Sequence, residues 1–256
     1  MRQAVLFDLF GTLVHFRTHI PRVESGSPAW RTTLQWLEPL CTEHLPEVPF
    51  SAFLDALLAT TREIVSQRAP EYLEVPSQER FARALRSLGL APERARTIAA
   101  LFSERHMAHL TAQTELATQA NEVLQQLRGK TRLGLVSNFD HQPAAEQVLA
   151  RHHLRDFFDA VVISAGFGRR KPHPAIFRAA LEQIGATPDE AWFVGDNYEE
   201  DILGATAAGL RPVWLCPAGP GLAAPAGVTV IRSLGELLEL PLWNTSAALV
   251  PRPGRT

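Results

Sequence analysis

Lysine is scarce in this sequence: only Lys130 and Lys171 among the 25 basic residues are lysine, and the others are arginine. Positive charge is also never concentrated, because no run of five or more basic residues occurs and the formal net charge is −2 at pH 7. Nucleic acids and anionic membranes are bound through clustered positive charge, so the sequence predicts neither partner. Arginine supplies the ordinary surface charge, which makes a lysine in this chain a candidate for a special role.

Cysteine is equally scarce, and long apolar runs are absent. Cys41 and Cys216 are too few and too far apart for a disulfide framework or a zinc site, so we expect two buried thiols. No apolar run reaches the length of a membrane span, and the first residues lack a signal-peptide pattern. The composition, 46% hydrophobic and 20% charged, is typical of a globular protein, which we expect in the cytoplasm.

The sequence pattern of residues 16–111 is typical of a helical bundle. Apolar residues recur at helical spacing between Phe50 and Val65, and the block contains no convincing strand. Ser77 is the expected N-cap of one helix, and Pro92 is expected to open the next. The arginines of this block should mostly form a solvated face, from which one or two reach an anionic substrate: Arg31, Arg62, Arg68, Arg80 and Arg83.

The rest of the chain alternates short apolar runs with amphipathic helical patterns. Runs that are apolar throughout and separated by helices are typical of a parallel sheet covered by helices on both faces. We therefore predict a Rossmann-like α/β core with strands at Ala4–Phe7, Arg132–Val136, Ala160–Ile163, Ala191–Val194, Pro212–Leu215 and Val228–Ile231. Because only the first strand precedes the helical block, the block is an insertion. The predicted division is an α/β core at 1–15 and 112–241, an all-helical cap at 16–111 and a C-terminal tail at 242–256.

Polar clusters directly follow four of the predicted strands. Ligands bind beyond the carboxyl ends of the strands in parallel α/β sheets, so these clusters should meet at one edge. Each cluster alone is explained as a cap, a turn or a solvated charge, but neighbouring carboxylates repel unless a cation neutralises them. The clusters are Asp8–Leu13, Ser137–Asn138, Ser164 with Gly168–Pro172, and Gly195–Asp201.

The residue types in these clusters predict phosphoryl transfer. Asp8 and Asp196 offer oxygen ligands, which suit a hard cation such as Mg²⁺. Such an ion attracts a phosphate and stabilises charge during its transfer. The hydroxyls of Thr12 and Ser137 can hydrogen-bond to phosphoryl oxygens, and Lys171 can balance the remaining charge. A carboxylate nucleophile would form an aspartyl phosphate, which water later cleaves.

The same clusters, in order and spacing, resemble the four motifs of the haloacid dehalogenase superfamily. The similarity covers about residues 1–15 and 112–240, and the family places a helical cap after its first motif, which fits 16–111. The matching segments are Phe7-Asp8-Leu9-Phe10-Gly11-Thr12-Leu13, Val136-Ser137-Asn138, Lys171-Pro172-His173-Pro174-Ala175-Ile176-Phe177, and Val194-Gly195-Asp196 with Asp201.

This resemblance implies a catalytic centre built around one nucleophile and one metal ion. Asp8 would be the nucleophile and a Mg²⁺ ligand, together with Asp196 and the backbone carbonyl of Phe10. Asp201 would support the metal site, and Lys171 would orient Asp8 and neutralise charge.

A second set of positions would bind the transferred group. By the same resemblance, Thr12, Ser137, the backbone of Asn138 and Lys171 would hold the phosphoryl group of a small phosphorylated metabolite.

One position departs from the phosphatases of this family. They usually carry a general acid–base aspartate two residues after the nucleophile, where this chain has Phe10. General acid catalysis contributes roughly 10²–10⁴ in rate, so cleavage of alkyl phosphates with poor leaving groups should be slow. The sequence leaves two roles open for His15: a hinge residue or a substitute proton donor.

Phe10 also keeps two other functions open. Dehalogenases of this family usually have an aromatic residue at that position, and a halide leaves without a proton. Hydrolysis of a carbon–halogen bond is therefore one alternative, although the Gly195-Asp196 pair resembles those dehalogenases poorly. A weakly catalytic phospho-ligand binding protein is the other.

Overall fold

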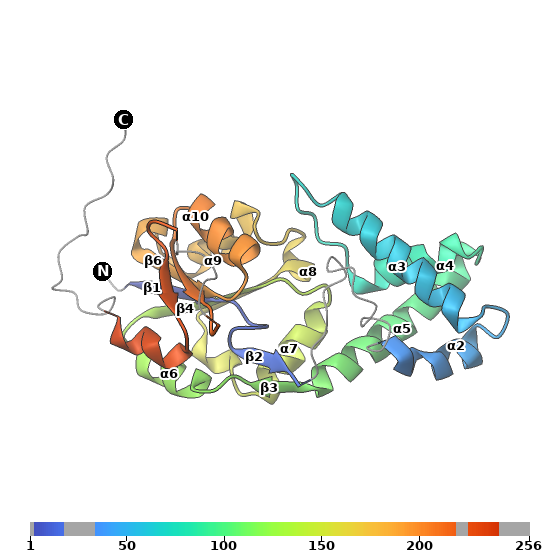
Figure 1. Cartoon of the computed structure of the whole chain (residues 1–256), viewed down its shortest axis with the longest axis horizontal. Helices are drawn as coiled ribbons and strands as arrows, with labels where there is room; N and C mark the ends of the chain where they lie inside the picture. The colour runs from blue at the N-terminus through green and yellow to red at the C-terminus, as the bar shows by residue number, and fades with distance from the viewer. Residues whose placement is uncertain (1–2, 18–33, 219–224, 241–256) are drawn as a thin grey trace.

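The elements of the protein form two units, a sheet covered by helices and a group of helices beside it (Figure 1). The computed structural model describes residues 3–17, 34–218 and 225–240. The predicted C-terminal tail at 242–256 and Arg31 lie outside these residues. None of the helices in the described ranges is both long and apolar enough to cross a membrane.

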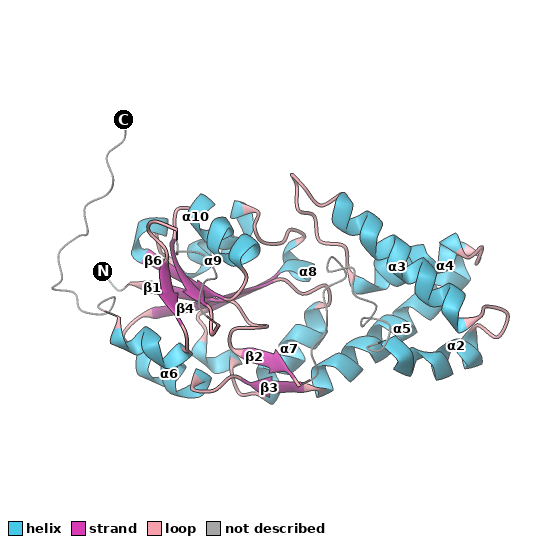
Figure 2. Cartoon of the chain, viewed as in Figure 1, coloured by secondary structure: helices cyan, strands magenta, loops and turns pink. Residues whose placement is uncertain are grey.

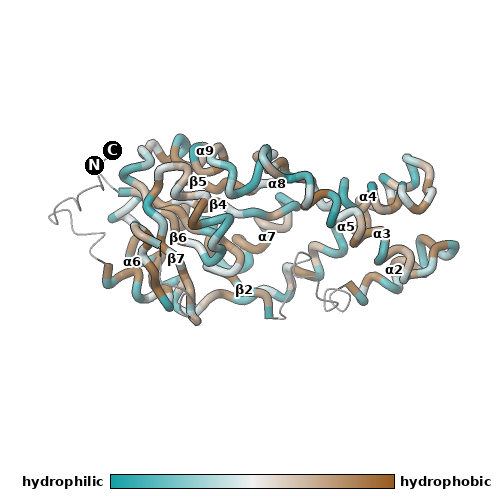
Figure 3. Tube along the Cα trace, turned by 45° about the horizontal axis from the view of Figure 1, so that its top comes forward, coloured by the Kyte–Doolittle hydropathy of each residue, from teal (hydrophilic) through white to brown (hydrophobic). Residues whose placement is uncertain are grey.

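Six parallel strands form the central sheet, in the order β5-β4-β1-β6-β7-β8. The strands are β1 (Ala4–Phe7), β4 (Arg132–Ser137), β5 (Ala160–Ile163), β6 (Ala191–Gly195), β7 (Arg211–Leu215) and β8 (Thr229–Ile231). Each lies within one residue of its predicted bounds at either end. The apolar stretches gather along these strands in the hydropathy view (Figure 3). β1 lies at the centre, paired with β4 and β6, so the loops after these three strands emerge side by side.

Helices cover both faces of this sheet (Figure 2), which confirms the predicted α/β fold. Val5 and Phe7 pack into a cluster with α6 (Ala120–Leu127), α7 (Gln142–Arg151) and the 3₁₀ helix η6 (Leu234–Glu239). Ala4 and Leu6 pack on the other face with α9 (Pro174–Ile184) and α10 (Gly204–Ala207). All four β1 side chains are fully buried, as expected for the central strand of a doubly covered sheet.

The second unit consists of α2 (Glu38–His44), α3 (Phe50–Ser66), α4 (Ser77–Ser87) and α5 (Pro92–Ala112). It has an apolar cluster of its own, in which Phe102 lies 5.5 Å from Phe53 and 6.3 Å from Phe81 between ring centroids. Pro92 opens α5, as predicted. The separate cluster supports the predicted cap, whose boundaries stay a prediction.

The expected N-cap at Ser77 is wrong. Ser77 is the first residue of α4, and Pro76 occupies the cap position without a capping side chain. The Ser77 hydroxyl is buried and hydrogen-bonds to the hydroxyl of Ser103 on α5 instead. A buried hydroxyl needs such a partner, and the facing helix supplies it.

A two-stranded antiparallel sheet, whose strands precede and follow the helical unit in the chain, was not predicted. β2 (Val14–Phe16) pairs with β3 (Thr114–Leu116), with His15 opposite Glu115. Three-residue strands are too short to show a sequence period, so only the tertiary pairing defines them. The remaining elements are η2 (Gln35–Leu37), η3 (Arg155–Phe157), α8 (Ser164–Phe167), η4 (Pro188–Glu190) and the π-helical turn η5 (Tyr198–Leu203).

The separate apolar cluster predicts that the helical unit can be destabilised by itself. Phe102→Ala removes a fully buried ring and should lower the free energy of unfolding by about 3–5 kcal/mol. Limited proteolysis should then cut within the helical unit before the sheet unit. Leu203→Ala, at a side chain that is 47% exposed, should change stability by less than ~0.5 kcal/mol. Early cleavage of the sheet unit in Phe102→Ala would contradict the division into two units.

Candidate active site

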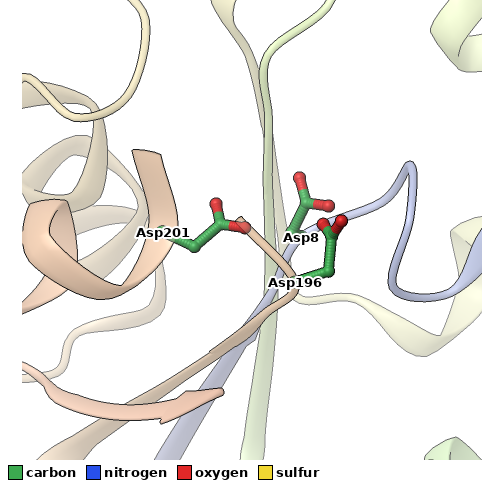
Figure 4. A group of neighbouring side chains, drawn as sticks. All are labelled: Asp8, Asp196 and Asp201. Atoms are coloured by element: carbon green, nitrogen blue, oxygen red, sulfur yellow. The ribbon is translucent and has the colours of Figure 1, made fainter. Parts of the chain in front are cut away.

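Three carboxylates meet where β1 and β6 end. Asp8 directly follows β1, and its amide donates a hydrogen bond to the carbonyl of Val194 in β6 at 2.9 Å. Asp196 directly follows β6, and Asp201 lies one turn further along in η5. One oxygen of each carboxylate lies within 4.8 Å of the others (Figure 4). The sequence predicted this convergence from the strand ends alone, and the geometry lets one ion contact all three groups.

Lys171 is the counter-charge of this cluster. Its side chain is 1% exposed, and its Nζ lies 2.6 Å from Asp8 Oδ1 and 2.6 Å from Asp201 Oδ1. The ammonium also lies 5.2 Å from the ring centroid of Phe193. One of the two lysines of the chain is therefore buried between two carboxylates.

Asn138 holds the backbone of Lys171 in place. The Lys171 amide donates to Asn138 Oδ1 at 2.7 Å, and Asn138 Nδ2 donates to the Lys171 carbonyl at 3.0 Å. The resemblance implied a role for the Asn138 backbone, whereas the structure shows its side chain bridging two loops. No sequence pattern reports such a long-range pair of hydrogen bonds.

Asp201 and Asp196 are fixed by their neighbours. The amide of Asn197 donates to Asp201 Oδ2 at 2.9 Å, and a Cβ on Gly195 would collide with the Asp201 side chain. The indole of Trp214 donates to the Asp196 carbonyl at 2.9 Å. These contacts hold the turn that carries both carboxylates.

The electrostatics of the cluster favour an added cation. The pKa of Asp8 is raised to about 8, mainly by burial and further by the carboxylates of Asp201 and Asp196, while the Lys171 ammonium opposes this rise. Burial opposes the charged form of Lys171, but the carboxylates of Asp201 and Asp8 outweigh this and raise its pKa. When all three carboxylates are ionised, they exceed the one ammonium by two negative charges, which one divalent cation balances.

Two further observations fit a ligand bound at this place. Asp8 Oδ2 is buried and has no hydrogen-bond partner among the described residues, so it is available to a ligand. Gly11 has φ +98°, and a Cβ there would lie 2.5 Å from Asp196 Oδ2. The glycine therefore leaves the space that the carboxylate of Asp196 fills. The donor set consists of oxygens only, as Mg²⁺ prefers.

The two predicted phosphate-binding hydroxyls are also buried. Thr12 and Ser137 are both 0% exposed, and neither Thr12 Oγ1 nor Ser137 Oγ has a hydrogen-bond partner among the described residues. Buried hydroxyls are nearly always paired, so these two, near the carboxyl ends of the neighbouring strands β1 and β4, are available to bond a polar ligand.

A cavity of about 240 Å³ opens onto the cluster. Its lining is charged and joins both units: Asp8, Phe10, Arg68, Asn138, Arg170, Asp196, Asn197, Glu200 and Asp201. Arg68 lies just beyond α3 in the helical unit, and it is one of the arginines expected either to face solvent or to reach the substrate; it lines the cavity. Arg80 departs from the expected solvated face, because its side chain is only 23% exposed and pairs with Asp140 at 3.0 Å. The sequence could not place these arginines because their position depends on how the two units contact each other.

Phe10 forms an aromatic wall of this cavity. Its ring stacks on Phe139 at 4.6 Å and on Phe16 at 5.2 Å between centroids. The position at which the resemblance leads us to expect a general acid in a phosphatase is thus filled by a packed aromatic ring. His15 is exposed on β2 and is not part of the cavity lining within the described residues.

A family model described as "haloacid dehalogenase-like hydrolase" matches residues 3–209. The chain therefore belongs to this family of hydrolases.

Curated relatives of this chain include phosphatases. Phosphoserine phosphatase of Thermus thermophilus is 38% identical over 142 residues, which is 55% of this chain and 55% of that protein. Pyrimidine 5'-nucleotidase YjjG of Escherichia coli is 42% identical over 114 residues, 42% of this chain and 49% of that protein. The chain thus spans about half the length of the curated relatives it matches.

Solved structures show the same fold. A 2-haloacid dehalogenase from Pseudomonas syringae has a TM-score of 0.70 and 24% identity, covering 93% of this chain and 97% of that one. A family phosphatase from Thermococcus onnurineus has a TM-score of 0.55 and 22% identity, covering 93% and 96%. At these identities the likeness concerns the fold alone.

Because Gly11 packs against Asp196, a larger side chain at position 11 should specifically weaken metal binding. Gly11→Ala should weaken Mg²⁺ binding by roughly 10–100-fold, as measured by isothermal titration calorimetry, because the new methyl group displaces the carboxylate. Gly129→Ala is the matched control: it has φ +79° but no atom within 4 Å of the new Cβ. Gly129→Ala should lower the free energy of unfolding and leave the Mg²⁺ affinity unchanged. Equal Mg²⁺ affinity in both variants would show that Asp196 does not bind the ion.

Proposed function

We propose that this protein is a Mg²⁺-dependent phosphatase that acts on a small phosphorylated metabolite through an aspartyl phosphate at Asp8. The observation that carries this proposal is the buried cluster in which Lys171 holds one oxygen of Asp8 and leaves the other unpartnered. The names of the curated relatives, which include phosphoserine phosphatase and N-acylneuraminate-9-phosphatase, support a phosphate monoester as substrate.

In this proposal the two oxygens of Asp8 have different tasks. Oδ1 is fixed by Lys171, while Oδ2 attacks phosphorus as the bond from phosphorus to the leaving oxygen breaks with its electron pair. Thr12 and Ser137 donate hydrogen bonds to the transferring oxygens. Water then attacks phosphorus, releasing phosphate and restoring the carboxylate of Asp8.

Mg²⁺ would be held by Asp8, Asp196 and the carbonyl of Phe10, with Asp201 in support. When bound, the ion neutralises the cluster and stabilises charge on the transferring group. Lys171 has a second task in this scheme, because its ammonium lowers the pKa of Asp8 and so partly offsets burial and the two neighbouring carboxylates.

Phe10 restricts which leaving groups can depart, but it does not hinder the attack of Asp8 on phosphorus. A packed ring cannot donate a proton, so the leaving oxygen departs as an anion unless another group protonates it. Substrates with good leaving groups, such as aryl and acyl phosphates, fit this site best.

Hydrolysis of a carbon–halogen bond is the second candidate, because a halide needs no proton and Phe10 costs such a reaction little. The excess negative charge of the cluster counts against it, since a haloacid carboxylate entering the cavity would be repelled. Binding of a phospho-ligand with weak turnover is the third candidate.

The first test concerns the nucleophile and the ion. Asp8→Asn should lower kcat on an aryl phosphate by roughly 10³-fold or more, since no other group can form the covalent intermediate. A chelator should remove activity reversibly. Asp156→Asn, at an exposed carboxylate on η3, should leave kcat unchanged. Turnover that persists in chelator would exclude this mechanism and favour the dehalogenase.

The second test concerns the missing acid. Aryl phosphates should react much faster than sugar phosphates of similar affinity, because only their leaving groups depart unprotonated. Phe10→Asp should then raise kcat/KM for alkyl phosphates selectively, by up to roughly 10²–10⁴-fold, in a steady-state assay across a leaving-group series.

Two variants control this measurement. Phe10→Asn opens the aromatic stack without adding an acid and should give no selective gain. His15→Ala should be silent, because His15 is exposed and away from the cavity lining in the described residues. Loss of alkyl-phosphate activity in His15→Ala would identify it as the proton donor, and equal rates across the series would refute the limiting role of Phe10.

A further inference from the structure

The segment between α3 and α4, residues 67–76, reaches from the helical unit to the sheet unit; we call it the strap. In Figure 1 it is the blue-green loop that leaves α3 towards α8. Its main chain pairs with the loop that precedes Lys171. The amide of Glu74 donates to the Gly168 carbonyl at 3.0 Å, and the amide of Arg170 donates to the Tyr72 carbonyl at 2.9 Å.

Glu74 adds a buried side-chain contact to this pairing. Its side chain is 3% exposed, although it is a carboxylate. It accepts a hydrogen bond from the Ser164 hydroxyl at 2.5 Å, and it lies 3.3 Å from the guanidinium of Arg170. Ser164 in turn accepts a hydrogen bond from the Phe139 amide at 2.9 Å, next to Asn138. Burying a carboxylate is costly unless it is paired, so this contact fixes where the strap sits.

Arg170 connects Glu74 to the catalytic cluster. Its other guanidinium nitrogen lies 3.1 Å from Glu200 in η5, the turn that carries Asp201. Arg170 is also the residue directly before Lys171, which contacts Asp8 and Asp201. The strap therefore holds both the lysine and one of its partners through a single arginine.

We propose that Glu74 is a positioning residue that couples the seating of the strap to the placement of Lys171 between Asp8 and Asp201. This inference rests on the proposed function for its kinetic part, but the placement of Lys171 is independent of activity. Glu74 itself touches no reacting atom; it acts through Arg170. A displacement of about 1 Å at a catalytic group can cost 10²-fold in rate, so loss of the contact should slow the chemical step.

The chain offers a matched control on the same strap. Glu71 pairs with Arg169 at 2.9 Å, but its side chain is 60% exposed. Glu71→Gln removes one strap-to-loop ion pair just as Glu74→Gln does, without disturbing a buried group. Glu74→Asp keeps the charge and shortens the side chain, and it serves if Glu74→Gln does not fold.

Because the chain has only two lysines, the placement of Lys171 can be measured without an activity assay. The full-length protein with Mg²⁺ is treated briefly with acetic anhydride, and acetylation at Lys171 and Lys130 is quantified by mass spectrometry. Lys130 is exposed and reports reagent and dose, whereas Lys171 is protected by burial. Glu74→Gln should raise the ratio of Lys171 to Lys130 acetylation by roughly tenfold or more, because local opening exposes the amine. Glu74→Asp should give a smaller rise, and Glu71→Gln none.

The kinetic readout separates positioning from mere stability. On an aryl phosphate, Glu74→Gln should lower kcat by roughly 10–100-fold and change KM less than about twofold. An unchanged acetylation ratio in a folded Glu74 variant, or an equal rise in Glu71→Gln, would overturn the inference. If the unmodified protein does not cleave aryl phosphates, the proposed function fails, and the acetylation ratio still decides the role of Glu74.

Discussion

The buried ion pairs between the Lys171 ammonium and the carboxylates of Asp8 and Asp201 are the interaction on which the site depends. Without this ammonium, the two carboxylates and the third at Asp196 would repel one another more strongly, and the pKa of Asp8 would rise further. Lysine fits this place as a compact charge on a long apolar stem. The rest of the site holds it there: Asn138 fixes its backbone, and Glu74 reaches its loop from the other unit.

The charge that Lys171 leaves unbalanced explains both the metal and the chemistry we propose. One divalent cation makes the cluster neutral and turns a set of carboxylates into a site that accepts an anionic phosphate. Phe10 also restricts the reaction, because its stacked ring shapes the cavity but cannot donate a proton. The same two features weigh against a haloacid substrate, which gains from Phe10 but is repelled by the carboxylates.

The sheet and the convergence of Asp8, Asp196 and Lys171 followed from the sequence because both are local in origin. Apolar runs mark strands, and residues directly after parallel strands meet at one edge. The position of Arg68 in the cavity, the burial of Glu74 and the β2–β3 pair could not be predicted, because each depends on how two distant segments pack. Ser77 shows the same limit: its local signal favoured a cap, and a hydroxyl on α5 bound it instead.

Chemical trapping of Asp8 tests the central claim most directly. The protein is mixed with a stoichiometric amount of aryl phosphate, quenched in acid within the first turnover, and digested for mass spectrometry of the peptide that contains Asp8. We predict a phosphoryl group on Asp8 that appears only with Mg²⁺ and decays as phosphate is released. Full release of the aryl alcohol with Asp8 unmodified throughout would contradict nucleophilic attack by this residue.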